Sequence, residues 1–203
     1  TYAINQLSCE GCGLCAAICP VGAVRSSRNI NGQWYVSNTD YGPMVHARLG
    51  IAEENSGRLV SCVRDKAATI AAEQGREQIL SDGPPGTGCP VIASVTETDY
   101  VLLVTEPAVS GVHDLTRVLD LAAHFRVTAL VVINKADINP DKAEQIRALS
   151  AEKGAVVLGT IPFDRTVNDA LMEGATVIDY GESPARDAII GIHKALTAYL
   201  HQT

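Results

Sequence analysis

Four cysteines near the start of the chain are the residues whose types and spacing best suit metal chemistry. They lie in the stretch CEGCGLCAAICP, residues 9 to 20, and fit the pattern C-x2-C-x2-C-x3-C-P. This spacing is typical of a short loop that wraps a cubane iron–sulfur cluster with thiolate ligands. A zinc site is the alternative, but structural zinc usually takes two separated pairs of ligands. The pattern therefore predicts a 4Fe–4S site with the ligands Cys9, Cys12, Cys15 and Cys19.

The number of clusters depends on the last cysteine of this run. In ferredoxins with two clusters, the fourth cysteine of such a run ligates the other cluster. The chain contains one run, so Cys19 either completes its own cluster or belongs to a second one. Cys62 and Cys89 are possible outside ligands, although a free cysteine usually behaves as a small buried hydrophobic residue. One cluster and two clusters both stay open.

The stretch DGPPGTG, residues 82 to 88, is a candidate phosphate site. We expect residues 78 to 81 to form a short strand with Asp82 at its carboxyl end, where open α/β sheets place ligands. In P-loop nucleotide hydrolases an Asp in this location holds Mg²⁺, and glycines leave backbone N–H groups free to face a γ-phosphate. A tight strand-to-helix turn capped by Asp82 is the alternative. The candidate site consists of Asp82, Gly83, Pro84, Pro85 and Gly86.

Polar residues also follow an apolar run at 129 to 133, ALVVI. Asn134 directly after this run can hydrogen-bond the edge of a purine. Together with Lys135 and Asp137 it also fits the N-K-x-D pattern by which GTPases bind guanine, so guanine stays open as the base. The alternative is a solvated loop in which Asp137 or Asn139 caps the following helix.

A third candidate loop is IPFD, residues 161 to 164, which follows the apolar run AVVL. Because the carboxyl ends of parallel strands lie at one edge of a sheet, we expect all three loops to lie at that edge. The chain has no G-x-x-x-x-G-K-[ST] motif, so the lysine of a phosphate-binding loop is missing. These two loops contribute Asn134, Asp137, Pro162, Phe163 and Asp164 as candidate site residues.

Apolar runs alternating with amphipathic segments predict the elements that position these residues. Strands are expected at 100–105, 129–133 and 155–158, and helices at 56–74, 112–125, from Pro140 onward and at 184–201. Residues 34 to 49 are rich in β-formers, with a break at 41–43. Continuous apolar strands separated by helices indicate an α/β fold, with a mostly parallel sheet covered by helices on both faces.

Composition narrows the classes of partner. The net charge is −7 and the pI about 5.2, which argues against nucleic acid as a partner and against adhesion to an anionic membrane. No apolar run approaches the roughly 18 residues of a membrane-spanning helix. Clustered cysteines beside a large core favour a metal site in a reducing cytoplasm over a disulfide framework.

In combination, these motifs resemble the MinD/ParA/Mrp-type P-loop ATPases that contain an inserted ferredoxin domain. The similar pieces are CEGCGLCAAICP, EENSGRLVSCVR, DGPPGTGCPV, TEPAVSGVHDL, VINKADIN and IPFD, in this order over nearly the whole chain. The resemblance implies an iron–sulfur segment at 1–33 and a MinD-like nucleotide hydrolase domain at 34–203. It also implies that the P-loop and another cysteine run lie upstream, so that the chain looks like the carboxyl-terminal part of a longer protein.

The resemblance also implies roles for single residues. Asp82 and Gly86 would form a switch that senses Mg²⁺ and the γ-phosphate of ATP, Asn134 would face adenine, and Pro162 to Asp164 would border the base. Glu54, Asn55 and Ser56 match a family signature, and Arg58 stands where the family often has lysine. A homodimer that sandwiches nucleotide, and a redox or iron–sulfur partner protein, are the expected partners.

The resulting expectation is an ATP- and Mg²⁺-dependent switch coupled to electron transfer or to iron–sulfur cluster handling. The longer protein would hydrolyse ATP, whereas these residues alone would be a poor ATPase. A ferredoxin-like module without nucleotide affinity is the first alternative. An amide-forming enzyme of the cobyrinic acid a,c-diamide synthase type is the second, although Cys62 and Cys89 lack the nearby His of an activated nucleophile.

Overall fold

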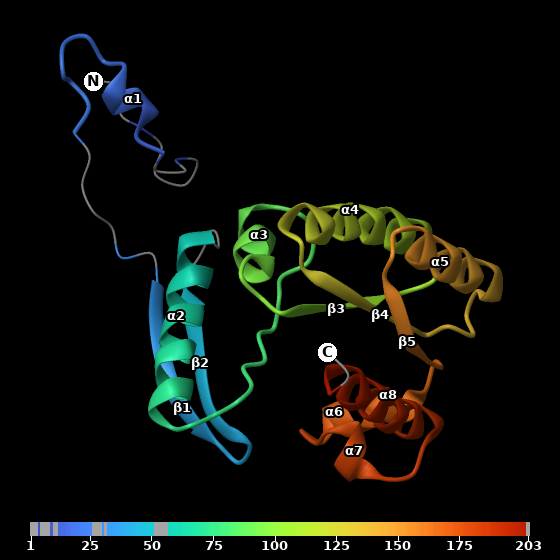
Figure 1. Cartoon of the computed structure of the whole chain (residues 1–203). Coiled ribbons are helices and arrows are strands. Elements are labelled where there is room, and N and C mark those ends of the chain that lie inside the picture. Colours follow the sequence, from blue (N-terminus) through green and yellow to red (C-terminus); the bar gives the residue numbers. More distant parts are fainter. Residues whose placement is uncertain are drawn as a thin grey trace. The chain divides into compact units, whose positions relative to one another are not determined.

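The computed structural model describes residues 4, 9, 12–25, 30, 32–50 and 57–201. The chain divides into two compact units, residues 1–81 and 82–203 (Figure 1). The expected division into an iron–sulfur segment at 1–33 and a nucleotide hydrolase domain at 34–203 stays a prediction. The family signature at residues 54–56 lies outside the described residues.

The first unit contains a short helix, a hairpin and a long helix: α1 (Leu14–Ala17), β1 (Gly32–Thr39), β2 (Gly42–Leu49) and α2 (Gly57–Glu73). The two strands are antiparallel, with Trp34 opposite Ala47 and Val36 opposite Val45. Because directly opposed residues share a face, these four side chains form an apolar side of the hairpin. α2 packs against β2, so the expected β-rich region and the helix after it are both present.

The prediction of a short strand at 78–81 is wrong, because these residues form no secondary structure. A strand needs a neighbour for its backbone N–H and C=O groups, and an isolated one is unstable in water. Among the described residues, no strand pairs with this segment. Its apolar side chains are accordingly uncovered, and Leu80 is 98% exposed.

The second unit is built on a parallel three-stranded sheet in the order β3–β4–β5. Each strand is followed by a helix, as the alternating apolar pattern predicts. The elements are α3 (Cys89–Val95), β3 (Tyr100–Thr105), α4 (Val109–Phe125), β4 (Thr128–Asn134), α5 (Pro140–Glu152), β5 (Val156–Ile161), α6 (Arg165–Met172), α7 (Val177–Tyr180) and α8 (Pro184–Leu200).

Helices cover both faces of this sheet, which confirms the expected α/β architecture (Figure 1). On one face, Val131 and Ile133 of β4 pack with Leu115, Leu119 and Ile146 of α4 and α5, and all five are buried. On the other face, α8 lies so close to β5 that a Cβ on Gly159 would be 2.7 Å from Cγ1 of Ile192. Glycine at this strand position therefore permits the close approach of α8.

Among the described strands β3 pairs with β4 alone, so it lies at an edge of this sheet. The expectation that residues 100–105 form a buried strand is only partly right: the strand is present, but Leu102 is 41% and Val104 62% exposed. Alternate residues of a strand point to opposite faces, so these two side chains lie on the same face of β3. That face of β3 is therefore partly uncovered.

No helix of the described residues is long and apolar enough to span a bilayer.

Candidate functional site: a base-sized cavity and a cysteine loop

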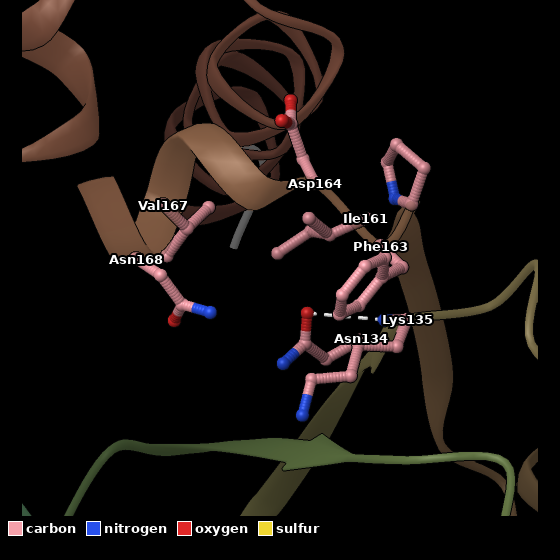
Figure 2. A pocket seen from close by; sticks show the side chains of 8 residues that line it. Asn134, Lys135, Ile161, Phe163, Asp164, Val167 and Asn168 are labelled. Carbon is pink, nitrogen blue, oxygen red and sulfur yellow. Dashed lines mark hydrogen bonds between the residues drawn. The ribbon is translucent and has the colours of Figure 1, made fainter. Parts of the chain in front are cut away.

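A small cavity lies where β4 and β5 end, at the carboxyl edge of the sheet (Figure 2). Its volume is about 120 Å³, below the roughly 300–1,000 Å³ of a pocket that encloses a drug-sized ligand. It can therefore hold one flat ring and leaves the rest of a larger ligand outside. The residues that line it are Asn134, Lys135, Ile161, Pro162, Phe163, Asp164, Val167 and Asn168.

Two hydrogen bonds hold the loops after β4 and β5 together. The Ala136 N–H donates to the Ile161 carbonyl at 3.0 Å, and the Phe163 N–H donates to Asp137 Oδ1 at 2.6 Å. The structure thus brings together two of the three loops that the sequence singles out. Of the two possible caps of α5, Asn139 is the one used: its side chain accepts from the Lys142 N–H at 3.1 Å.

Asn134 presents a carboxamide to the cavity (Figure 2). Its Oδ1 accepts from the Lys135 N–H at 3.0 Å, which fixes the orientation of the amide group. A carboxamide oxygen has a second lone pair, and the NH₂ group donates two hydrogens. Asn134 can therefore still donate to and accept from the edge of a purine ring.

Asn168 lines the opposite side of the cavity from α6 (Figure 2). Sequence reasoning missed this residue because the α6 segment was not assigned to any element. The only signal was Asp164, four residues earlier, whose type and position favour a helix N-cap. With Asn134 and Asn168 on two sides, the cavity offers donors and acceptors suited to the polar edge of a base.

Lys135 connects the cavity to the loop after β3. Its Nζ lies 2.7 Å from Oε1 of Glu106, and both side chains are partly exposed. Its backbone has φ +52°, a left-handed conformation that non-glycine residues rarely adopt. Lys135 lines the cavity, and its ammonium group is paired with the carboxylate of Glu106.

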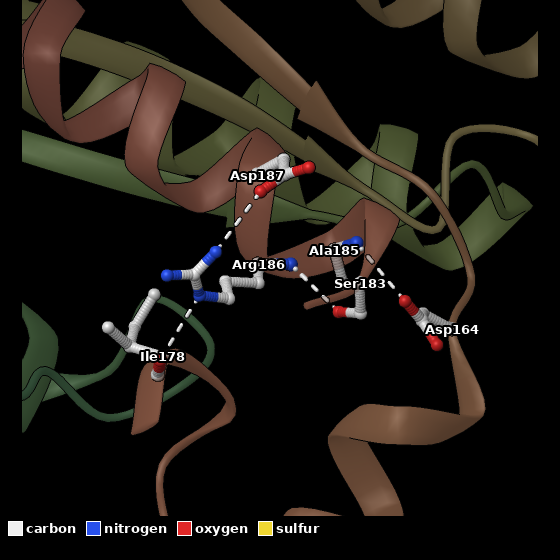
Figure 3. A network of polar contacts seen from close by, with 6 residues as sticks. All are labelled: Asp164, Ile178, Ser183, Ala185, Arg186 and Asp187. Carbon is white, nitrogen blue, oxygen red and sulfur yellow. Dashed lines mark hydrogen bonds and ion pairs between the residues drawn. The ribbon is translucent and has the colours of Figure 1, made fainter. Parts of the chain in front are cut away.

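Asp164 accepts hydrogen bonds from the starts of two helices, and Figure 3 shows the bond to α8. Its Oδ1 accepts from the Thr166 N–H of α6 at 2.9 Å, and its Oδ2 accepts from the Ala185 N–H of α8 at 3.1 Å. Hydrogen bonds from Thr166, followed by the bond from Ala185, lower the pKa of this carboxyl group from 3.8 to about 2. Asp164 lines the cavity, but both of its oxygens are engaged by helix ends. Its expected contact with a base stays a prediction.

Acid should therefore weaken the junction of α6 and α8. A carboxyl group with a lowered folded-state pKa stabilises the fold above its unfolded pKa, and this stabilisation is lost as the pH falls through the folded value. We expect Asp164 to contribute fully above about pH 5, and to lose its contribution as the pH falls from 3.8 toward about 2. Urea unfolding of the parent chain and of Asp164→Asn at pH 7 and pH 3 measures this effect. The variant should have a lower free energy of unfolding than the parent at pH 7. It should also lose less of that free energy between pH 7 and pH 3. Parallel losses in the two proteins would contradict this role.

The stretch from Asp82 to Gly88 precedes α3 and has no regular structure. Asp82 is exposed, and within the described ranges it has no hydrogen bond or ion pair. Gly86 has φ +90°, so this position favours glycine. No described contact joins Asp82, Gly83, Pro84, Pro85 or Gly86 to the cavity. Their roles in holding Mg²⁺ and phosphate stay predictions.

The cysteine loop has one thiol in a defined hydrogen-bonding environment. Cys19 Sγ accepts from the Ala23 N–H at 3.3 Å, and this bond, with weaker ones from neighbouring N–H groups, lowers the pKa of the thiol. A lowered pKa favours the thiolate, which is the form that ligates iron. This environment of Cys19 fits an iron–sulfur ligand.

The other three cysteines of the run, Cys9, Cys12 and Cys15, are exposed. Gly13 lies between Cys12 and Cys15, directly before α1, and has φ +77°. Among the described residues, which exclude Glu10 and Gly11, no three metal-binding side chains gather around one point. The assignment of Cys9, Cys12, Cys15 and Cys19 as one ligand set therefore stays a prediction from the spacing. Cys62 on α2 and Cys89 at the start of α3 are exposed rather than buried.

Comparisons with known proteins agree with both halves of this description. Residues 2–25 match the family of 4Fe–4S binding domains. An uncharacterised protein of Methanocaldococcus jannaschii is 34% identical over 138 residues, which cover 68% of this chain and 48% of that protein. An iron–sulfur cluster carrier protein of Pyrococcus abyssi is 25% identical over 61% of this chain and 46% of its own length. The chain thus spans about half the length of these curated relatives.

Among solved structures, the septum site-determining protein MinD of Pyrococcus horikoshii, solved with Mg-ADP, superposes with a TM-score of 0.55. The identity is 21%, over 72% of this chain and 58% of that one. At this level of identity the likeness concerns the fold. The chain therefore has a MinD-like α/β fold preceded by a segment that matches 4Fe–4S binding domains, as the motifs predict.

Proposed function

We propose that the chain is part of an iron–sulfur-containing MinD-type ATPase, in which ATP and Mg²⁺ control electron transfer or iron–sulfur cluster handling. The observation that carries this proposal is the base-sized cavity between the ends of β4 and β5, with Asn134 directed into it. Open α/β sheets bind their ligands at this edge. The cysteine run in the same chain supplies the iron–sulfur half of the proposal.

The cavity is suited to adenine. A carboxamide can pair with the amine and the adjacent ring nitrogen of adenine, donating one hydrogen bond and accepting the other. Asn134 is held in a fixed orientation by the Lys135 N–H, and Asn168 lies across the cavity from it. The apolar side chains of Ile161 and Val167 add surface against which a flat ring can pack.

The phosphates would lie outside the cavity. Asp82 would then hold Mg²⁺, and Gly83 to Gly86 would offer backbone N–H groups to the γ-phosphate, as in P-loop nucleotide hydrolases. The phosphate-binding lysine is absent from these 203 residues. Sequence outside them would supply it in a protein of the relatives' full length. The edge of β3, with Leu102 and Val104 exposed, is a place where the sheet can gain a further strand.

The iron–sulfur segment would hold one or two 4Fe–4S clusters, which store or pass on single electrons. The name of the Pyrococcus relative, an iron–sulfur cluster carrier, supports cluster handling, and the MinD structure with Mg-ADP supports the nucleotide. We further propose a homodimer and a redox or iron–sulfur partner protein. Binding of ATP and Mg²⁺ would order the loop after Asp82, and hydrolysis would release it.

A titration of Mg-ATP followed by NMR tests the nucleotide half on the chain itself. We expect weak binding, because the phosphates lack their lysine, with shifts concentrated at the backbone amides of Asn134 and Phe163. Asn134→Ala should remove these shifts, whereas Asn38→Ala in the hairpin should keep them. Absence of shifts at saturating Mg-ATP would contradict the proposal and favour a ferredoxin-like module without nucleotide affinity.

A further inference from the structure

Asp137 is the last residue of the N-K-x-D motif, yet it is not among the residues that line the cavity. Its Oδ1 instead accepts a 2.6 Å hydrogen bond from the backbone N–H of Phe163, a residue 26 positions later in the chain. A carboxylate that accepts from a backbone N–H makes a short, strong hydrogen bond. This bond joins the loop after β4 to the loop that forms one side of the cavity.

This geometry conflicts with recognition of guanine by Asp137. Guanine presents N–H donors on one edge, and a carboxylate that binds this edge must be directed into the cavity. Asp137 is absent from the residues that line the cavity, and its Oδ1 accepts from the Phe163 N–H instead. Of the polar side chains that line the cavity, Lys135 is paired with Glu106 and Asp164 accepts from two helix N–H groups. This leaves the carboxamides of Asn134 and Asn168 to face a base.

We propose that Asp137 is a positioning residue that holds the 161–164 loop as a wall of the base cavity, and that it does not contact the base. The second bond between the loops, from the Ala136 N–H to the Ile161 carbonyl at 3.0 Å, aligns the ends of β4 and β5. Of these two bonds, the one from Phe163 to Asp137 lies beyond the end of β5. The inference rests on the proposed function of the cavity, but the contact itself can be tested without nucleotide.

Amide hydrogen exchange of Phe163 in the nucleotide-free chain tests the contact. Asp137→Ala should accelerate this exchange by about tenfold or more, the range for loss of a hydrogen bond to a charged group. Asp137→Asn keeps an acceptor oxygen and should retain most of the protection. The control is Asp141→Ala, which removes the same charge four positions later and should leave Phe163 unchanged. Unaltered exchange in Asp137→Ala would overturn the proposal.

Titrations with Mg-ATP and Mg-GTP then show whether Asp137 positions the loop or recognises the base. If Asp137 only positions the loop, Asp137→Ala should weaken both nucleotides by a similar factor, and Asp137→Asn should restore the binding and base preference of the parent chain. A change of base preference in Asp137→Asn with Phe163 protection intact would show that the carboxylate reads the base, and would overturn the proposal. Loss of protection in Asp137→Ala without any nucleotide binding by the parent chain would uphold the contact and contradict the proposed function alone.

Discussion

Anaerobic reconstitution with iron and sulfide is expected to turn the chain brown, and Cys12→Ala is expected to abolish this colour. The reason is that cubane clusters are held by cysteine thiolates, and removal of one ligand leaves an iron open to solvent. Bound iron and sulfide, the visible absorbance and the electron paramagnetic resonance of the reduced protein measure the loss. Cys62→Ala, which removes an exposed thiol on α2, is the control and should retain the cluster.

Cys19→Ala extends this experiment to the number of clusters. If Cys19 completes the same cluster, its loss should be as severe as that of Cys12. If Cys19 serves a second cluster, Cys19→Ala should keep the signal of the first. Full reconstitution of Cys12→Ala would contradict the assignment of the run, and zinc in place of iron in the isolated protein would favour the alternative reading of the cysteines.

Gly111→Ala is expected to destabilise the second unit strongly. A Cβ at this position would collide with the carbonyl oxygen of Glu106 and lie 3.1 Å from Oγ1 of Thr105. Thr105 is itself buried, and its hydroxyl donates to the Gly111 carbonyl at 3.2 Å, so the first turn of α4 cannot easily move away. Forced overpacking of this kind costs roughly 1–3 kcal/mol. Urea unfolding followed by circular dichroism measures the change.

Gly191→Ala is the matched control for this substitution. Gly191 lies within α8, and a Cβ there would have open space around it. Alanine is favoured over glycine inside a helix by up to about 1 kcal/mol, so this variant should be slightly more stable than the parent. Equal unfolding midpoints for Gly111→Ala and the parent would show that α4 tolerates a shift of its first turn.

Local sequence patterns predicted the elements that are buried on both faces. Residues 129–133 are apolar without interruption, which is the signature of a central parallel strand, and β4 is such a strand. Pro140 after Asn139 correctly marked the start of α5, because proline fits the first helical position and asparagine caps it. The candidate loops after β4 and β5 could be located for the same reason, since each follows directly after a strand.

The contacts that shape the cavity could not be predicted in this way. Asp137 bonds a residue far along the chain, and Asp164 joins the starts of two helices that are not adjacent in the sequence. Such pairs depend on how the elements pack, which periodicity does not encode. The strand expected at 78–81 failed for a related reason. An apolar run predicts a strand only if a neighbouring strand is available to pair with it.

The edge of β3 also affects how the isolated chain behaves in the laboratory. An open strand edge beside uncovered side chains, here Leu102 and Val104, can pair with the same edge of another copy. Leu80, which is almost fully exposed, adds a second apolar position at which copies can associate. In concentrated samples we therefore expect the chain to self-associate independently of nucleotide binding. Titrations and unfolding measurements on this chain are best made dilute and repeated at two protein concentrations.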